Sequence, residues 1–246
     1  ISWMTKVALI TGGARGLGAS MAMDLAENGW QVYATYKHDR SALELQNLCL
    51  HKNIIKIKCD IENSHEIEKL KDLLQTKYGF IDALVNNAGI NYRETMWEIT
   101  EDSWDSILNT NLKHQFFFTR KLWELVKVSK LKRIVFISSA AGQYHGPKTL
   151  HYAVAKAAVI SMTKVMARYG SEDGIFVNAI APGLIETDQT KDEFASGEAD
   201  AIIKSTTLLG RHGYPQDVSS ALRFLLDERQ TYMTGQVLSV SGGAIL

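Results

Sequence analysis

The stretch VALITGGARGLG, residues 7–18, decides the fold, because a short apolar run passes directly into a glycine-rich turn. Residues 19–28 follow with helical periodicity, which places Met21 and Leu25 on one side. A strand, a glycine turn and a helix in this order bring together backbone N–H groups and a helix N-terminus, which can hold a pyrophosphate. Met21 occupies the third glycine position of the general G-x-G-x-x-G pattern, so the spacing is T-G-x-x-x-G-x-G instead. The stretch predicts the start of a dinucleotide-binding fold.

Apolar runs and helical stretches alternate along the chain. Strands are predicted at residues 6–10, 31–35, 54–58, 82–86, 132–138, 175–181 and 236–240. Helices are predicted at residues 16–28, 40–50, 64–78, 101–128, 152–171, 190–205 and 215–227. This alternation predicts an α/β fold, a single doubly wound parallel sheet of the Rossmann type with helices on both faces. No linker or repeat interrupts the pattern, so residues 1–246 are expected to form one domain.

Composition narrows the classes of partner. Hydrophobic residues make up 46% of the chain, charged residues make up 22%, and the formal net charge is zero. These ordinary values indicate no nucleic-acid partner and no anionic membrane, and the apolar runs are too short to span a bilayer. Cys49 and Cys59 form no metal or redox motif. Two isolated cysteines are typical of a reducing compartment, so we expect a cytoplasmic protein without a metal site.

Tyr152 and Lys156 lie four residues apart in an alanine-rich helical stretch, so their side chains share one face. A nearby ammonium favours a phenolate, and we expect Lys156 to lower the pKa of Tyr152 from about 10 toward the range useful for proton transfer. Ser139, which follows the apolar run 133–138, is placed to hydrogen-bond the same substrate oxygen. Taken alone, the Tyr–Lys spacing also fits a pair on an amphipathic surface.

Further short motifs follow the predicted strands. Asn86-Asn87-Ala88-Gly89 follows the fourth strand, Ser138-Ser139 the fifth and Pro182-Gly183 the sixth. Ligands of such a sheet bind beyond the carboxyl ends of its strands. We therefore expect these motifs and the glycine turn to converge on one site.

These motifs, in this order and together with Asn111, closely resemble those of the classical short-chain dehydrogenase/reductase family over essentially the whole chain. The nearest pattern is that of the 3-oxoacyl-thioester reductases, of the acyl-carrier-protein and acetoacetyl-CoA types. The resemblance implies an enzyme that transfers a hydride from a nicotinamide to a small ketone. It implies a general acid in Tyr152, a group that orients the substrate oxygen in Ser139, and an anchor for the nicotinamide ribose in Lys156. Asn111 would anchor a water of the proton relay.

The end of the second predicted strand bears on the choice of cofactor. NAD sites place a carboxylate there, whereas NADP sites need cations for the 2′-phosphate. Tyr36 stands where the family usually carries the acid, Lys37 follows it, and Arg15 lies in the glycine turn. These residues favour NADP(H) over NAD(H), with Asp39 as the alternative ribose partner. The resemblance implies further cofactor contacts at Gly12, Gly16, Leu17, Gly18, Asp60, Asn87, Ala88, Gly89, Tyr152, Lys156, Pro182, Gly183 and Thr187.

Substrate and assembly are predicted more coarsely. The polar stretch 184–207 resembles the mobile substrate lid of the family. Glu172-Asp173 stands where carrier-protein reductases present a basic residue, which argues against an acidic carrier protein as the substrate. A free small ketone or another acyl carrier is the alternative. Three adjacent phenylalanines at 116–118 cannot all face one core. Because the family packs this helix across a dimer interface, we expect a homotetramer.

Three functions fit these observations. The intact catalytic residues favour an NADPH-dependent ketone reductase. An NAD-dependent alcohol or sugar dehydrogenase would use the same residues, and only the cations near the second strand argue against it. A catalytically silent nucleotide-binding regulator would be expected to have lost Tyr152 or Lys156, and this chain has lost neither.

Overall fold

The computed structural model describes residues 5–38, 51–144, 149–187, 190, 194–195 and 197–244. The predicted helix at 40–50 lies outside the described residues, as do Asp39 and part of the predicted lid. Within these described ranges, no helix is both long and apolar enough to cross a membrane.

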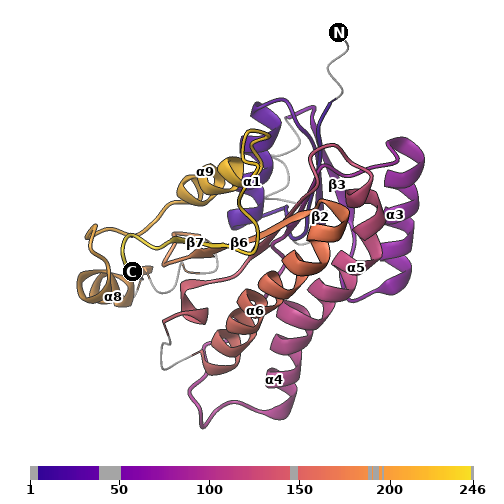
Figure 1. Ribbon diagram of the computed structural model, residues 1–246. Helices are drawn as coiled ribbons and strands as arrows, with labels where there is room; N and C mark the ends of the chain where they lie inside the picture. The colour runs from indigo at the N-terminus through magenta and orange to yellow at the C-terminus, as the bar shows by residue number, and fades with distance from the viewer. Residues whose placement is uncertain are drawn as a thin grey trace.

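One parallel sheet of seven strands has the order β3-β2-β1-β4-β5-β6-β7 (Figure 1). The strands are β1 (Val7–Ile10), β2 (Gln31–Tyr36), β3 (Ile54–Lys58), β4 (Ala83–Asn86), β5 (Arg133–Ile137), β6 (Phe176–Pro182) and β7 (Val237–Val240). The strand order reverses at β1, which pairs with β2 on one side and with β4 on the other. The predicted doubly wound fold is confirmed.

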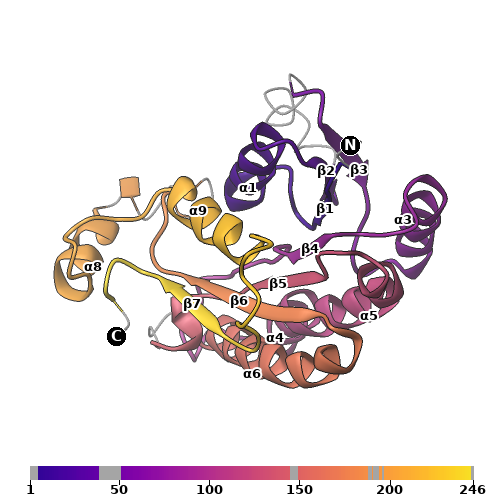
Figure 2. The ribbon, with the colours of Figure 1, turned by 45° about the horizontal axis from the view of Figure 1, so that its top comes forward.

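Helices cover both faces of the sheet. They are α1 (Gly16–Glu27), α3 (Ser64–Lys77), α4 (Glu101–Leu108), α5 (His114–Lys127), α6 (Leu150–Asp173), α8 (Glu198–Thr206) and α9 (Pro215–Leu225). Ala8 and Ile10 of β1 pack in one core with α1 and α9, whereas Val7 and Leu9 pack in the other with α3, α5 and α6. Figure 2 shows these two layers on opposite sides of the sheet. The alternation along β1 follows from the two-residue period of a strand.

The predicted helix at 101–128 is interrupted. α4 ends at Leu108, a π-helical segment occupies Asn109–Lys113, and α5 begins at His114. Inside this segment the buried side chain of Asn111 pairs with the backbone of Ile90. Such wide turns often occur at functional sites, because the extra residue redirects a side chain. A period of 3.6 residues continues on both sides, which is why the sequence predicted one helix.

In the described part of the predicted lid, residues 194–195 are helical and a second helical stretch, α8, follows them. α8 starts at Glu198, directly after Gly197, whose backbone is left-handed with φ of 75°. A left-handed residue cannot continue a right-handed helix, so the turn at Gly197 sets this boundary. α8 lies beyond the carboxyl ends of β6 and β7 (Figure 1).

Candidate active site

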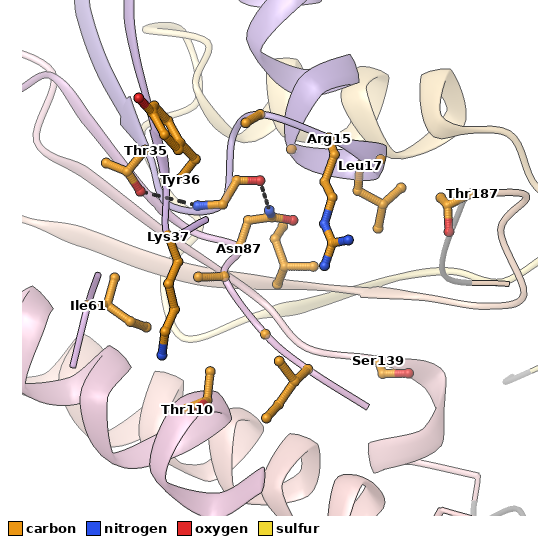
Figure 3. A pocket seen from close by; sticks show the side chains of 18 of the residues that line it. Arg15, Leu17, Thr35, Tyr36, Lys37, Ile61, Asn87, Thr110, Ser139 and Thr187 are labelled. Carbon is orange, nitrogen blue, oxygen red and sulfur yellow. Dashed lines mark hydrogen bonds between the residues drawn. The ribbon is translucent and has the colours of Figure 1, made fainter. Parts of the chain in front are cut away.

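The carboxyl ends of several strands open onto one pocket of 880 Å³ (Figure 3). The predicted residues that line it are Gly12, Arg15, Gly16, Leu17, Gly18, Lys37, Asp60, Asn87, Ala88, Gly89, Ser139, Tyr152, Lys156, Pro182, Gly183 and Thr187. Tyr36 also lines it, at the end of β2. The fold therefore brings the separate motifs of the sequence into a single cavity.

Close backbone contacts shape the glycine turn after β1. The N–H of Gly13 donates to the carbonyl of Thr35 at 2.9 Å, and the N–H of Gly12 donates to Thr35 Oγ1 at 3.3 Å. A Cβ on Gly18 would collide with the carbonyl oxygen of Gly12, so α1 can approach the turn this closely only with glycine at that position. The first-turn N–H groups of α1 consequently lie beside a compact loop, an arrangement that suits a pyrophosphate.

Asn87 ties the glycine turn to the end of β4. Its Nδ2 donates to the carbonyl oxygens of Thr11 at 3.0 Å and Gly12 at 3.1 Å. In return, Thr11 Oγ1 accepts from the backbone N–H groups of Asn87 and Ala88, both at 3.0 Å. Two of the predicted cofactor-binding segments are thus connected to each other by four hydrogen bonds. The amide of Asn87 holds the shape of the loop as well as facing the pocket.

The two predicted cations differ in their surroundings. Lys37 Nζ lies 2.9 Å from Asp60 Oδ2 and 3.7 Å from Glu62 Oε1. Burial opposes its charge, but the hydrogen bond and the attraction to these two carboxylates raise the pKa of Lys37. Arg15 is exposed and its guanidinium extends into the pocket (Figure 3). With the described residues Arg15 forms no ion pair.

Sequence reasoning missed two polar residues at this end of the pocket. Glu62 faces Lys37, and its carboxylate also accepts a hydrogen bond from Thr110 Oγ1. Both Glu62 and Thr110 line the cavity. They stand 48 positions apart in the chain, so no local pattern joins them. Glu62 is two residues from Asp60 and Thr110 is next to Asn111 in the sequence, and this nearness to predicted site residues was the signal that could have identified them.

Ser139, Tyr152 and Lys156 lie together at another part of the same pocket. Tyr152 and Ser139 are hydrogen-bonded through their side chains. Lys156 is 3% exposed, its Nζ donates to the carbonyl of Ile137 at 2.8 Å, and it lies 5.5 Å from the centre of the Tyr152 ring. The four-residue spacing on α6 therefore forms part of a pocket and is no pair on an open surface.

The predicted direction of the Tyr152 pKa is wrong in this structure. Burial raises the pKa of Tyr152, and the hydrogen bond with Ser139, which lowers it, does not outweigh burial. Lys156 is itself buried, which lowers its pKa to about 8. Burial disfavours the charged form of each group, and this effect decides the direction of both pKa values. Tyr152 therefore retains its proton at neutral pH.

Asn111 lies directly behind the pocket wall. Its Oδ1 accepts from the N–H of Ile90 at 2.9 Å, and its Nδ2 donates to the carbonyl of Ile90 at 2.7 Å. A Cβ on Gly89 would lie 2.5 Å from Asn111 Oδ1 and 3.6 Å from Lys156 Nζ. Gly89 thus occupies the narrow space between these two side chains, and its missing Cβ lets them come close.

The segment after β6 also lines the cavity. Gly183 packs against Ser241, where an added Cβ would lie 2.8 Å from the Ser241 Cα. Thr187 reaches the glycine turn, since its Cβ is 3.8 Å from the position of a Cβ on Gly16. Thr187 is held by Thr190, whose Oγ1 accepts its N–H at 2.9 Å. The beginning of the predicted lid therefore lies beside the start of α1.

Known proteins share this arrangement of sequence and fold. The sequence profile of the family described as "Enoyl-(Acyl carrier protein) reductase" matches residues 12–244. This chain belongs to the short-chain dehydrogenase/reductase family. Like other members of the short-chain dehydrogenase/reductase family, it is an oxidoreductase, as the sequence predicted.

Similar members of this family span nearly the whole chain. A "3-oxoacyl-[acyl-carrier-protein] reductase" of Synechocystis sp. is 34% identical over 245 residues, which cover 98% of this chain and 97% of the relative. The corresponding reductase of Thermotoga maritima is 35% identical over 246 residues and covers 98% of each chain. Among solved structures, one described as "ElxO with NADP Bound" is 31% identical, with a TM-score of 0.90 and coverage of 98% of this chain and 99% of that one. The crystal structure of gox2181 is 27% identical, with a TM-score of 0.91 and coverage of 98% of this chain and 95% of that one.

Proposed function

We propose that this protein uses NADPH to reduce a ketone carbonyl to an alcohol, with Tyr152 as the general acid. One observation carries the proposal: the glycine turn and the Ser139, Tyr152 and Lys156 side chains line the same cavity. The names of the relatives, which are 3-oxoacyl-[acyl-carrier-protein] reductases, support this reaction. The NADP bound to ElxO, a close structural neighbour, supports the cofactor.

The pocket residues fit such a dinucleotide. Gly16 and Gly18 place no side chain at the N-terminus of α1, where a pyrophosphate would be held by backbone N–H groups. The guanidinium of Arg15 extends into the cavity, where it would pair with the 2′-phosphate (Figure 3). Bound NADPH would supply the hydride for the carbonyl carbon.

The chain's own residues would orient the substrate and supply the proton. Ser139 would donate a hydrogen bond to the carbonyl oxygen and polarise it. Tyr152, whose pKa is raised by burial, keeps its proton until charge develops on that oxygen and then gives it up. Lys156, with a pKa of about 8, is mostly charged at neutral pH and would bind the ribose and stabilise the phenolate. Asn111 would anchor the water that returns the proton.

A 3-oxoacyl thioester or a similar small ketone is the proposed substrate. In the sequence, the acidic pair Glu172-Asp173 argued against an acidic carrier protein as the substrate. These two residues end α6, whereas Tyr152 lies in the first turn of that helix. At 1.5 Å per residue the two positions are about 30 Å apart along the helix. Asp173 is also paired with Lys127 at 2.9 Å. These carboxylates do not border the pocket of their own chain, so they give no reason to exclude a carrier there.

An NAD-dependent alcohol or sugar dehydrogenase is the second candidate, and one observation favours it. Asp60 and Glu62 already balance the charge of Lys37, and carboxylates at this end of the pocket suit a free ribose hydroxyl. Preference for NADH over NADPH in binding would favour this candidate over the reductase.

Four further assignments belong to the same proposal. The chain acts as one domain, and residues 184–207 serve as its substrate lid. It assembles as a homotetramer. Its compartment is the cytoplasm, as the isolated cysteines indicated.

The test is the Tyr152→Phe variant, which keeps the ring and removes the proton donor. Turnover of NADPH with a panel of 3-oxoacyl thioesters and small ketones should fall by about 100-fold or more, because general acid catalysis contributes that much. NADPH binding, measured by nicotinamide fluorescence, should stay within about twofold, since the cavity is preserved. Undiminished turnover would remove Tyr152 from the mechanism, and a wild-type protein that binds neither NADPH nor NADH would overturn the function.

A further inference from the structure

His151 precedes the proposed general acid and is fully buried. Both of its ring nitrogens have partners. Nδ1 accepts the backbone N–H of Tyr152 at 3.0 Å, and Nε2 lies 3.1 Å from Glu94 Oε2. Since the N–H of Tyr152 can only donate, Nδ1 carries no proton, and the neutral ring donates from Nε2 to the carboxylate.

This arrangement replaces a missing helix cap. The first N–H groups of a helix lack partners within the helix. Thr149 is the N-cap residue of α6, but its side chain makes no capping hydrogen bond. The ring of His151 supplies the acceptor that Thr149 does not. The first turn of α6, and with it the backbone of Tyr152, is therefore fixed by an imidazole instead of a hydroxyl.

Glu94 connects this imidazole to the loop after β4. The Glu94 backbone pairs with that of Thr149 in an isolated bridge, and the ring of Tyr92 packs 6.4 Å from the ring of His151. The same loop begins at Ile90, whose backbone N–H and carbonyl are both hydrogen-bonded to the side chain of Asn111. The segment 90–94 is thus attached at one end to Asn111 and at the other to the start of α6.

We propose that His151 and Glu94 form a positioning pair for Tyr152. The imidazole fixes the first turn of α6, the carboxylate fixes the tautomer and the direction of the imidazole, and together they join the phenol to the loop 90–94. The pair contacts neither substrate nor cofactor and acts only through Tyr152. This inference rests on the proposed function, because it assumes that the phenol takes part in the reaction.

Three variants test the pair. Glu94→Ala removes the acceptor for Nε2–H, and misplacement of the phenol should lower kcat by about 10- to 100-fold. The KM for NADPH should change by less than about twofold, because the glycine turn is untouched. Glu94→Gln keeps an acceptor oxygen and should restore kcat to within about threefold of wild type. Glu101→Ala removes an exposed carboxylate from the next helix and serves as the matched control, with wild-type kcat.

Hydrogen exchange gives a readout that needs no substrate. The backbone amides of residues 150–156 should exchange faster in Glu94→Ala than in wild type, and neither Glu94→Gln nor Glu101→Ala should show this change. Equal kcat in Glu94→Ala and wild type would overturn the pair, as would a Gln variant as impaired as the Ala variant. If the wild type reduced no ketone, the proposed function would fail, and unchanged exchange in Glu94→Ala would separately overturn the positioning role.

Discussion

Lys156 carries an amine that the fold removes almost entirely from water. Its side chain is 3% exposed, and its polar contact is the carbonyl of Ile137. Desolvation lowers its pKa from 10.5 to about 8. A shift of this size corresponds to roughly 3 kcal/mol of unfavourable free energy when the amine is charged in the folded protein. The residue is therefore retained at the cost of stability, as is common for groups with a functional role.

Lys156→Met should be more stable than wild type at pH 7, by about 1–2 kcal/mol after the lost hydrogen bond is subtracted. Between pH 8 and 10.5 the unfolded wild type binds more protons at this lysine than the folded protein does, so wild-type stability rises with pH in this window. The advantage of the Met variant should accordingly disappear near pH 10. Urea unfolding of both proteins at pH 7 and pH 10 measures the difference between their free energies of unfolding. A difference of the same size at both pH values would contradict the burial argument.

At the scale of elements, the end of β2 and the start of α1 each present one cation to the pocket. Lys37 follows β2 and is held by Asp60 and Glu62, whereas Arg15 precedes α1 and extends into the cavity. A cation whose charge is already balanced gains less from a phosphate than one that is not. We therefore expect Arg15 to contribute more than Lys37 to the binding of a 2′-phosphate, although nothing in the sequence distinguishes the two residues.

Arg15→Ala should weaken NADPH binding by about 10-fold or more, since a charge-assisted hydrogen bond to phosphate contributes about 1.5–3 kcal/mol. NADH, which lacks the 2′-phosphate, is the internal control and should bind Arg15→Ala nearly as it binds wild type. Lys37→Ala should reduce NADPH affinity by a smaller factor. Titration of nicotinamide fluorescence gives the three affinities: those of Arg15→Ala for NADPH and for NADH, and that of Lys37→Ala for NADPH. A larger loss in Lys37→Ala would show that Lys37 leaves its carboxylates to meet the phosphate.

The sequence predicted elements well where the pattern is local. All seven strands lie within one residue of their predicted bounds, because buried parallel strands read as short apolar runs. The π-helical segment at Asn109–Lys113 was missed, since one extra residue in a turn leaves the periodicity on either side intact. The Glu62–Thr110 contact and the Glu94–His151 pair were missed for another reason. Their members come from separate elements, and only tertiary packing brings them together.

At the scale of the whole molecule, apolar side chains remain exposed on α5 and α6. The phenylalanines of α5 divide as expected: Phe118 is fully buried, whereas Phe117 is 39% exposed. Along α6, Val154, Val165 and Tyr169 are 42%, 49% and 67% exposed. Their spacings of eleven and four residues place them on one side of the helix. Such a stripe is typical of an interface, and the tetramer stays a prediction that this face supports.

Light scattering after size exclusion should give wild-type protein a mass of about four times the 27.4 kDa of one chain. Changing Val165 and Tyr169 together to Glu places two charges on the stripe and should yield smaller species, because unpaired charges in an interface are costly. The far-UV circular dichroism should not change, since both side chains are exposed. A monomeric wild type, or a double variant of unchanged mass, would exclude this face as an interface.

The hydrogen bonds of Asn87 also say something about how the protein is made. The glycine turn is complete at residue 18, yet two of its carbonyls are held by a side chain that is translated some seventy residues later. A nascent chain that has left the ribosome with only β1, α1 and β2 therefore has the Thr35 contacts of the glycine turn but lacks those of Asn87. The glycine turn gains this second support when β4 emerges and pairs with β1. The pocket itself is completed later, by residues of the chain up to Thr187 and Thr190, so the order of synthesis is also the order in which the parts of this site are made.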